Sequence, residues 1–256
     1  MNTLSAQHLE HGRSQLMKIS LMGFLTVLVS LVALGQGSSV HLDMWTTVQI
    51  IFRDLGCIDE SFFVDPSFCG GDDLRSQIIW ELRFPRVLMA IVGGIGLATA
   101  GALMQGCLGN PLVSPLTLGV ASGAALGAAL AIVVGFSITS TGAFAIAGNA
   151  FVFSLIVVFL IIQLGRYRSI SAESYILVGI AITFIAGAIV STLQFFATDA
   201  QLSQLAHWSF GSLSRPDITV VLGVAICIFA LLPQAMVWSW DLSLIHISEP
   251  TRLQQI

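Results

Sequence analysis

Charged residues are missing from long stretches of this chain. No Lys, Arg, Asp or Glu occurs among the 79 residues of Val87–Gly165. A helix crosses the hydrocarbon core of a bilayer in about 20 residues, so this stretch has room for about three crossings. Three other uncharged runs could each hold one crossing, namely Ile19–Leu42, Ser174–Thr198 and Ile218–Trp240. The pattern therefore predicts six spans, at 19–35, 87–107, 118–136, 143–164, 174–197 and 218–238.

Composition supports a membrane protein and excludes two other classes. Hydrophobic residues make up 55% of the 256 residues and charged residues only 9%, whereas a soluble domain carries roughly 25% charged residues. The net charge of −4 does not suit binding of nucleic acid through a basic surface. Because lipid offers backbone groups no hydrogen-bond partner, each span must be helical. We predict an all-α fold, a polytopic transmembrane helix bundle.

The polar segment 37–84 holds 8 of the 14 acidic residues and two of the four cysteines. Cys57 and Cys69 lie close together in it, which favours a disulfide in an oxidising compartment over two free thiols. Within the segment, apolar residues recur at helical spacing over Val40–Leu55. We expect a short amphipathic helix there, lying on the membrane surface.

Small residues are concentrated in the second and third predicted spans. Small side chains let transmembrane helices approach closely, so the stripe indicates tight packing, a helix that lines a transport path, or both. The residues predicted for this role are Gly93, Gly96, Gly101, Gln105, Gly119 and Gly123.

Catalytic chemistry is not evident. No predicted span has an Asp, Glu, Lys, Arg or His in its middle, and His207 suits an interface better than a metal site. The sequence has no HExxH, Walker A or GxSxG motif. We therefore predict neither an enzyme nor a metal site, and the energy for any transport must come from elsewhere. An ion-coupled secondary transporter and a membrane scaffold stay open as alternatives, although the first needs buried acids or inverted repeats.

Four segments resemble one family in order and spacing. The family comprises the permease subunits of iron–siderophore, haem and vitamin B12 ABC importers, of the FecCD type. The resemblance extends from about Ile78 to Asp241. It rests on Glu81–Leu88, which is similar to "LRLPR-VL", on Ala100–Ala124, on Leu177–Ala181, and on His207–Leu213, which is similar to "W-x-x-G-S-L".

The resemblance implies a helical permease that pairs, as a homodimer or with a second permease, around a central path. A periplasmic binding protein would deliver the substrate, and two ATP-binding cassette ATPase subunits would hold ATP and Mg²⁺, with no cofactor on the permease itself. Substrate would move by alternating access. The chain would lie in the inner membrane with its N-terminus in the cytoplasm and with loop 37–84 in the periplasm.

The resemblance also assigns roles to individual residues. Arg83 and Arg86 would dock the binding protein, although anchoring at lipid headgroups explains them equally well. Asn110, Pro111 and Pro115 would form a cytoplasmic turn. There the family usually reads "NPLADP", and Ser114 replaces the acid. A hydrogen-bonded turn can survive that change, but a charge-dependent role cannot.

The C-terminal part departs from the family. Family members have about ten spans, of which this chain would hold six. After Asp241 the sequence diverges, with no helical periodicity and with Pro250 as a breaker. We expect residues 1–241 to be part of an ABC importer transmembrane domain and 242–256 to be an artefactual tail foreign to the family. We also expect that the chain cannot transport substrate alone.

Overall fold

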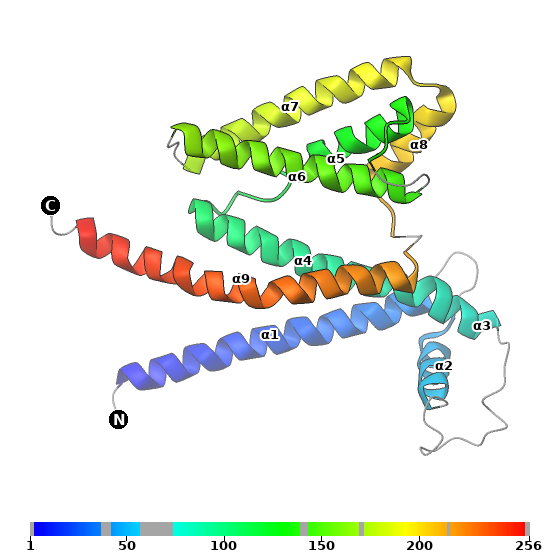
Figure 1. Ribbon diagram of the computed structural model, residues 1–256. Coiled ribbons are helices and arrows are strands. Elements are labelled where there is room, and N and C mark those ends of the chain that lie inside the picture. Colours follow the sequence, from blue (N-terminus) through cyan, green and yellow to red (C-terminus); the bar gives the residue numbers. More distant parts are fainter. Residues whose placement is uncertain are drawn as a thin grey trace. The chain divides into compact units, whose positions relative to one another are not determined.

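The computed structural model describes residues 3–36, 42–56, 74–138, 143–168, 172–213 and 216–253. Within these ranges, the side chains of 3–12, 55–56, 143, 167–168, 172–173 and 238–253 lie outside the description. The described residues form helices and connecting turns without a strand, which confirms the all-α prediction (Figure 1). The elements are α1 (Thr3–Gly35), α2 (Met44–Gly56), α3 (Leu74–Gln77), the π-helix η2 (Ile78–Arg83), α4 (Phe84–Leu108), α5 (Val120–Ala129), the π-helix η3 (Leu130–Val134), α6 (Ala143–Arg168), α7 (Ala172–Phe196), α8 (Asp199–Phe210) and α9 (Ile218–Leu253).

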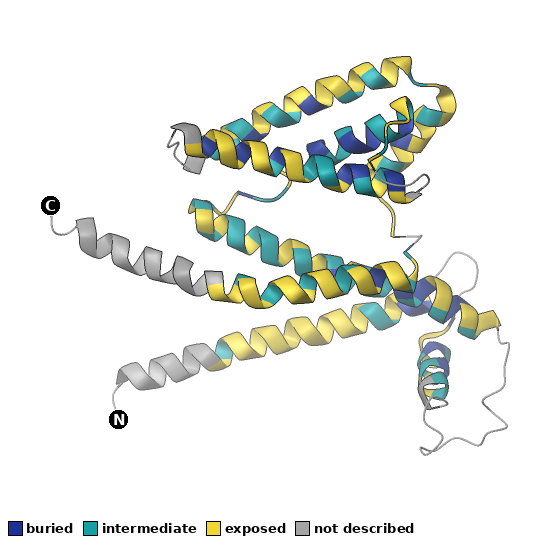
Figure 2. Cartoon of the chain, in the orientation of Figure 1, coloured by how far each residue is buried: buried dark blue, intermediate teal, exposed yellow. Residues whose placement is uncertain are grey.

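Five helices of the described chain are long and apolar enough to cross a membrane. These candidate spans are Arg13–Gly35, Leu74–Leu108, Phe144–Arg166, Ser174–Phe196 and Ile218–Val237. They match the first, second, fourth, fifth and sixth predicted spans. α1 is exposed along almost all of its described length (Figure 2), as expected of a helix whose surroundings are lipid.

The third predicted span, 118–136, is wrong in length. The helix there covers only Val120–Val134, which at about 1.5 Å per residue spans about 22 Å, less than the about 30 Å hydrocarbon core. Two left-handed glycines delimit it: Gly119, with a φ of 78°, precedes α5, and Gly135, with a φ of 74°, follows η3. Hydropathy alone did not reveal these two ends.

The chain divides into two compact units, and the first comprises Met1–Ile91 with Ser214–Leu222. Within the predicted loop 37–84 the structure adds helical residues that were not expected, since α3 and η2 cover Leu74–Arg83. The expected short helix is present as α2, and its location on the membrane surface stays a prediction. Ile50 of α2 forms a small buried core with Leu42, just before α2, and with Ile79 of η2.

Elements α3, η2 and α4 follow one another without a break and form one long helix, Leu74–Leu108. It begins thirteen residues before the predicted start at Val87. Proline lacks an N–H and crowds the carbonyl four residues before it, so Pro85 would ordinarily interrupt a helix at this position. Instead a π-turn precedes it, and the Phe84 N–H donates to the carbonyl of Ile79, five residues back. This wider turn lets one helix continue past the proline.

The second unit comprises Val92–Leu213 with Gly223–Ile256. In it, α5 packs against α6 and α7 (Figure 1). A Cβ added at Gly123 would lie 2.6 Å from Val157 Cγ2, and one at Gly127 would lie 2.5 Å from the Asn149 carbonyl oxygen. The glycine stripe of α5 thus allows a close approach of α6, as the packing interpretation predicts.

α8 was not predicted, because its sequence reads as a polar connection. It begins with a capping box in which the Thr198 side chain accepts from the Gln201 N–H and the Gln201 side chain accepts from the Thr198 N–H. Leu205 on α8 packs into a buried cluster with Ala129 and Ile132. Local capping and one apolar anchor therefore position this short helix.

The C-terminal segment is helical, contrary to the expectation that it is irregular. α9 continues to Leu253 and includes Pro250. Because Pro250 lies within the last turn, it removes one hydrogen bond without ending a long run of helix after it. The foreign origin of residues 242–256 stays a prediction.

The close approach of α5 to α6 can be tested at one glycine. We expect Gly127→Ala to lower the free energy of unfolding in detergent by about 1–3 kcal/mol, because the new methyl group meets backbone that cannot easily move. The matched control is Gly187→Ala on α7, where an added Cβ meets nothing within 4 Å. Equal stability of the two variants would contradict the close packing of α5 on α6.

Candidate functional site

Arg83 is buried at the junction of α1 and η2. Its side chain is 6% exposed, and its Nη1 donates to the Leu34 carbonyl at 2.7 Å and to the Gly35 carbonyl at 2.8 Å. The last carbonyls of a helix have no partner within the helix, and a cation also suits the negative end of the helix dipole. Arg83 therefore caps α1 from 48 residues away in sequence.

This position does not suit the docking role predicted for Arg83. A guanidinium that is bonded to α1 and almost wholly buried is not presented to a partner protein. Arg86, one turn later, is only half-buried. Its Nε is buried and has no hydrogen-bond partner in the described structure. The two arginines of the motif thus differ in their surroundings.

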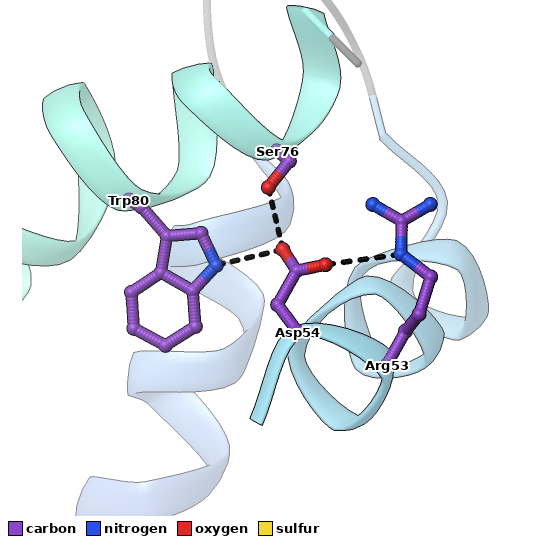
Figure 3. A network of polar contacts seen from close by, with 4 residues as sticks. All are labelled: Arg53, Asp54, Ser76 and Trp80. Atoms are coloured by element: carbon purple, nitrogen blue, oxygen red, sulfur yellow. Dashed lines mark hydrogen bonds and ion pairs between the residues drawn. The ribbon is translucent and has the colours of Figure 1, made fainter. Parts of the chain in front are cut away.

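Asp54 joins the end of α2 to the start of the long helix (Figure 3). Its Oδ2 accepts from Ser76 Oγ at 2.5 Å and from Trp80 Nε1 at 2.8 Å. Its Oδ1 pairs with Arg53 Nε at 3.0 Å. Sequence reasoning missed this network because Asp54 is one of eight acids in a polar segment, and only the fold brings it to Ser76 and Trp80.

Hydrogen bonding lowers the pKa of Asp54 below its usual 3.8. Partial burial acts in the opposite direction and is the largest single contribution, but the bonds from Ser76 and Trp80 and the interaction with Arg53 together outweigh it. All of these partners favour the charged carboxylate. The network is therefore fully formed at neutral pH.

The glycines predicted to line a path fall into two groups. Gly93 and Gly101 on α4 have open space where a Cβ would lie, whereas a Cβ at Gly96 would lie 2.8 Å from Ile228 Cδ1 of α9. At Gly119 an added Cβ would lie 2.9 Å from the Gly179 carbonyl of α7. The space beside Gly96, Gly119 and Gly123 is thus filled by other helices of the chain, whereas the space beside Gly93 and Gly101 is open.

Gln105 is bonded to the turn after α4. Its Nε2 donates to the Pro111 carbonyl at 3.1 Å and to the Val113 carbonyl at 3.4 Å. α4 ends in a Schellman motif: Gly109, with a φ of 58°, donates to Gly106, and Asn110 donates to Gln105. Gln105 therefore fastens the following turn to the helix end.

The predicted turn Asn110–Pro115 is stabilised by its own side chains. Asn110 Oδ1 accepts from the Leu112 N–H at 2.9 Å. Ser114 Oγ accepts from the Thr117 N–H at 3.3 Å, and Thr117 Oγ1 accepts from the Ser114 N–H at 2.9 Å. Serine therefore performs the hydrogen-bonding part of the role that an acid at this position would have.

The two cysteines that the structure describes add no site. Cys57 and Cys69 lie outside the described residues, so the disulfide stays a prediction. Cys107 and Cys227 are free and exposed. The described part of the chain contains no cluster of three or more His, Cys, Asp or Glu residues that could hold a metal ion.

The Asp54 network predicts a pH dependence. A carboxylate whose pKa is lowered by folding stabilises the fold above its usual pKa, and the stabilisation is lost as the pH falls through the lowered value. At neutral pH we expect the amides of α2 to exchange faster in Asp54→Asn than in the native chain, because the attachment of α2 is weaker in the variant by about 1–2 kcal/mol. As the pH falls and Asp54 is protonated, this difference between the two proteins should shrink. Identical exchange at both pH values would show that Asp54 does not hold α2.

The Ser114 turn predicts different results for two substitutions. Ser114→Asp keeps an acceptor for the Thr117 N–H and should leave thermal stability nearly unchanged. Ser114→Ala removes the acceptor and should cost about 0.5–1 kcal/mol, as the loss of a cap does elsewhere. Thermal unfolding in detergent distinguishes them, and a less stable aspartate variant would refute the assignment.

Comparison with known proteins agrees with the resemblance. The model of the FecCD transport family matches residues 25–254. The hemin transport system permease protein HmuU of Yersinia pestis is 32% identical over 203 residues, covering 79% of this chain and 56% of that protein. The vitamin B12 import system permease protein BtuC of Vibrio cholerae is 35% identical over 147 residues, covering 57% and 44%.

A solved structure is also similar. It is an ABC transporter assigned to the metal-chelate type, in an inward-facing conformation, with a TM-score of 0.66 and 25% sequence identity. The match covers 91% of this chain and 66% of that one. The chain spans about half the length of the curated relatives it matches.

The family match covers most of the chain and reaches past the boundary predicted at residue 241. With five candidate spans, the chain is a multi-pass membrane protein. It belongs to the FecCD transport family.

Proposed function

We propose that this chain forms part of the permease subunit of an ATP-driven importer for an iron chelate, haem or cobalamin. The observation that carries the proposal is the family match over residues 25–254, together with relatives named as hemin and vitamin B12 permeases. The permease itself is not catalytic. ATP and Mg²⁺ bind to a separate ATPase, and a second permease completes the path in the inner membrane.

Alternating access is the mechanism that suits this arrangement. ATP binding and hydrolysis in the partner bias a helix bundle between outward-open and inward-open states. The permease needs no tight substrate site, because the binding protein supplies affinity. Gly93 and Gly101 support this proposal, since the surface around them on α4 is open in the isolated chain.

In this proposal Arg86 is the residue that contacts the binding protein. Arg83 is committed to the end of α1, whereas Arg86 is half-buried with an unpaired Nε in the described structure. Because Arg86 is only half-buried, it is more accessible to a carboxylate of the binding protein than Arg83 is. Paired charges at such a surface mainly speed association and set its salt dependence.

Transport can be tested in a chimera in which residues 1–241 replace the matching part of a full-length relative. We expect ATP-dependent uptake of a labelled iron chelate, haem or cobalamin in vesicles that also carry the relative's ATPase and binding protein. Omitting either partner should abolish uptake. Uptake driven by an ion gradient without ATP would instead identify a secondary transporter, and a correctly inserted chimera that moves none of the three would refute the proposal.

Docking can be tested by removing single charges from the same chimera. Arg86→Gln should weaken binding of the binding protein several-fold and reduce its dependence on salt. Arg13→Gln removes the same charge at the N-terminal end of the first span and should leave binding unchanged. Unaltered binding by Arg86→Gln would remove Arg86 from the docking surface.

A further inference from the structure

One face of α2 is apolar and exposed. Met44 is 43% exposed, Trp45 68% and Phe52 71%, and Val48 lies partly exposed between them. At 3.6 residues per turn these four side chains share an arc of about 100°. We refer to them as the α2 outer face, which contains no charged residue.

The opposite face of α2 is already occupied by the rest of the first unit. Thr47 and Ile50 are buried there, and Asp54 bonds to Ser76 and Trp80. Helix α2 therefore cannot turn to bury its outer face against its own chain without losing these contacts. Whatever covers the outer face comes from outside the described fold.

A hydrogen bond ties the chain just before α2 to the end of α1. The Leu42 N–H, two residues before α2, donates to the Gly35 carbonyl at 3.2 Å. Gly35 is the last residue of α1 and of its candidate span. The first turn of α2 thus lies where an apolar transmembrane helix ends, which is the boundary between hydrocarbon and headgroups.

The side chains of the outer face suit that boundary. Tryptophan is enriched at membrane interfaces, where its ring lies at headgroup level. Helices that lie in the interface present Trp, Phe and Leu to the lipid. The last part of α1 also exposes apolar side chains, including Val29 and Val32, as expected of a helix that ends in lipid.

We propose that the α2 outer face lies in the membrane interface and contacts lipid, with Trp45 as its main anchor. A docking surface for the binding protein would need polar groups to pair with, and this face offers only the indole N–H. Anchoring of α2 holds the ends of α1 and of the long helix at a fixed depth, because Gly35, Arg83 and Asp54 connect them. The proposal concerns residence in the membrane and does not depend on transport activity.

The test uses the 256-residue chain in lipid nanodiscs. The emission of Trp45 is obtained as the difference between the native chain and Trp45→Phe, a conservative change at an exposed position. We expect lipids brominated near the headgroup end of the acyl chain to abolish most of this emission, lipids brominated near the chain end to reduce it less, and aqueous iodide to reduce it least.

A matched variant tests the face rather than the helix. Trp45→Phe combined with Thr46→Trp moves the indole by one position, about 100° around the helix, and its emission should be quenched only weakly by brominated lipid. Equal quenching of both would refute a specific outer face.

Strong quenching of Trp45 by iodide, with none by brominated lipid, would overturn the proposal. Protection from iodide that appears only with added binding protein, or only at high chain concentration, would identify that protein or a second copy as the occupant instead.

Discussion

Carbonyl groups at the ends of helices impose the constraint on which this structure depends. A helix leaves its last carbonyls without an internal partner, and in apolar surroundings water cannot supply one. The chain solves this with long polar side chains from distant positions. Arg83 caps α1, and Gln201 on α8 donates to the carbonyls of Ile132 and Val133 at the end of η3.

Buried Asn149 on α6 performs the same task for the turn after η3. It is fully buried, its Nδ2 donates to the Phe136 carbonyl at 2.6 Å, and its Oδ1 accepts from the Ile138 N–H at 2.9 Å. The short helix of α5 and η3 ends at this turn, within reach of α6, because glycines let the two helices come close. Helix ends and close packing are therefore linked: each capping side chain also joins two elements.

The sequence predicted the spans well and their ends poorly. Absence of charge located five spans because burial of unpaired charge in lipid is costly. Gly119 and Gly135 shortened the third, and the second begins well before its uncharged run, because the backbone adapts locally in ways that hydropathy does not record. α8 was missed because its helix depends on a capping box and on one buried leucine rather than on apolar periodicity.

The candidate site was predicted unevenly for the same reason. The turn at Asn110–Pro115 depends on bonds between near neighbours, so a local motif sufficed to find it. Arg83 bonds to carbonyls 48 and 49 residues away, and Asp54 bonds to Ser76 and Trp80, which lie 22 and 26 residues away. No local pattern reveals such pairings. The motif identified Arg83 as important, but only the fold shows that it holds the end of α1.

Replacement of Arg83 by methionine tests that central claim directly. The comparison is Arg86→Met, which removes the same charge one turn away. We expect Arg83→Met to lower the free energy of unfolding by about 1.5–3 kcal/mol and to accelerate amide exchange in the last turn of α1, while Arg86→Met changes neither. If Arg83→Met preserved both stability and exchange while weakening binding of the binding protein, Arg83 would be a docking residue and the account would be contradicted.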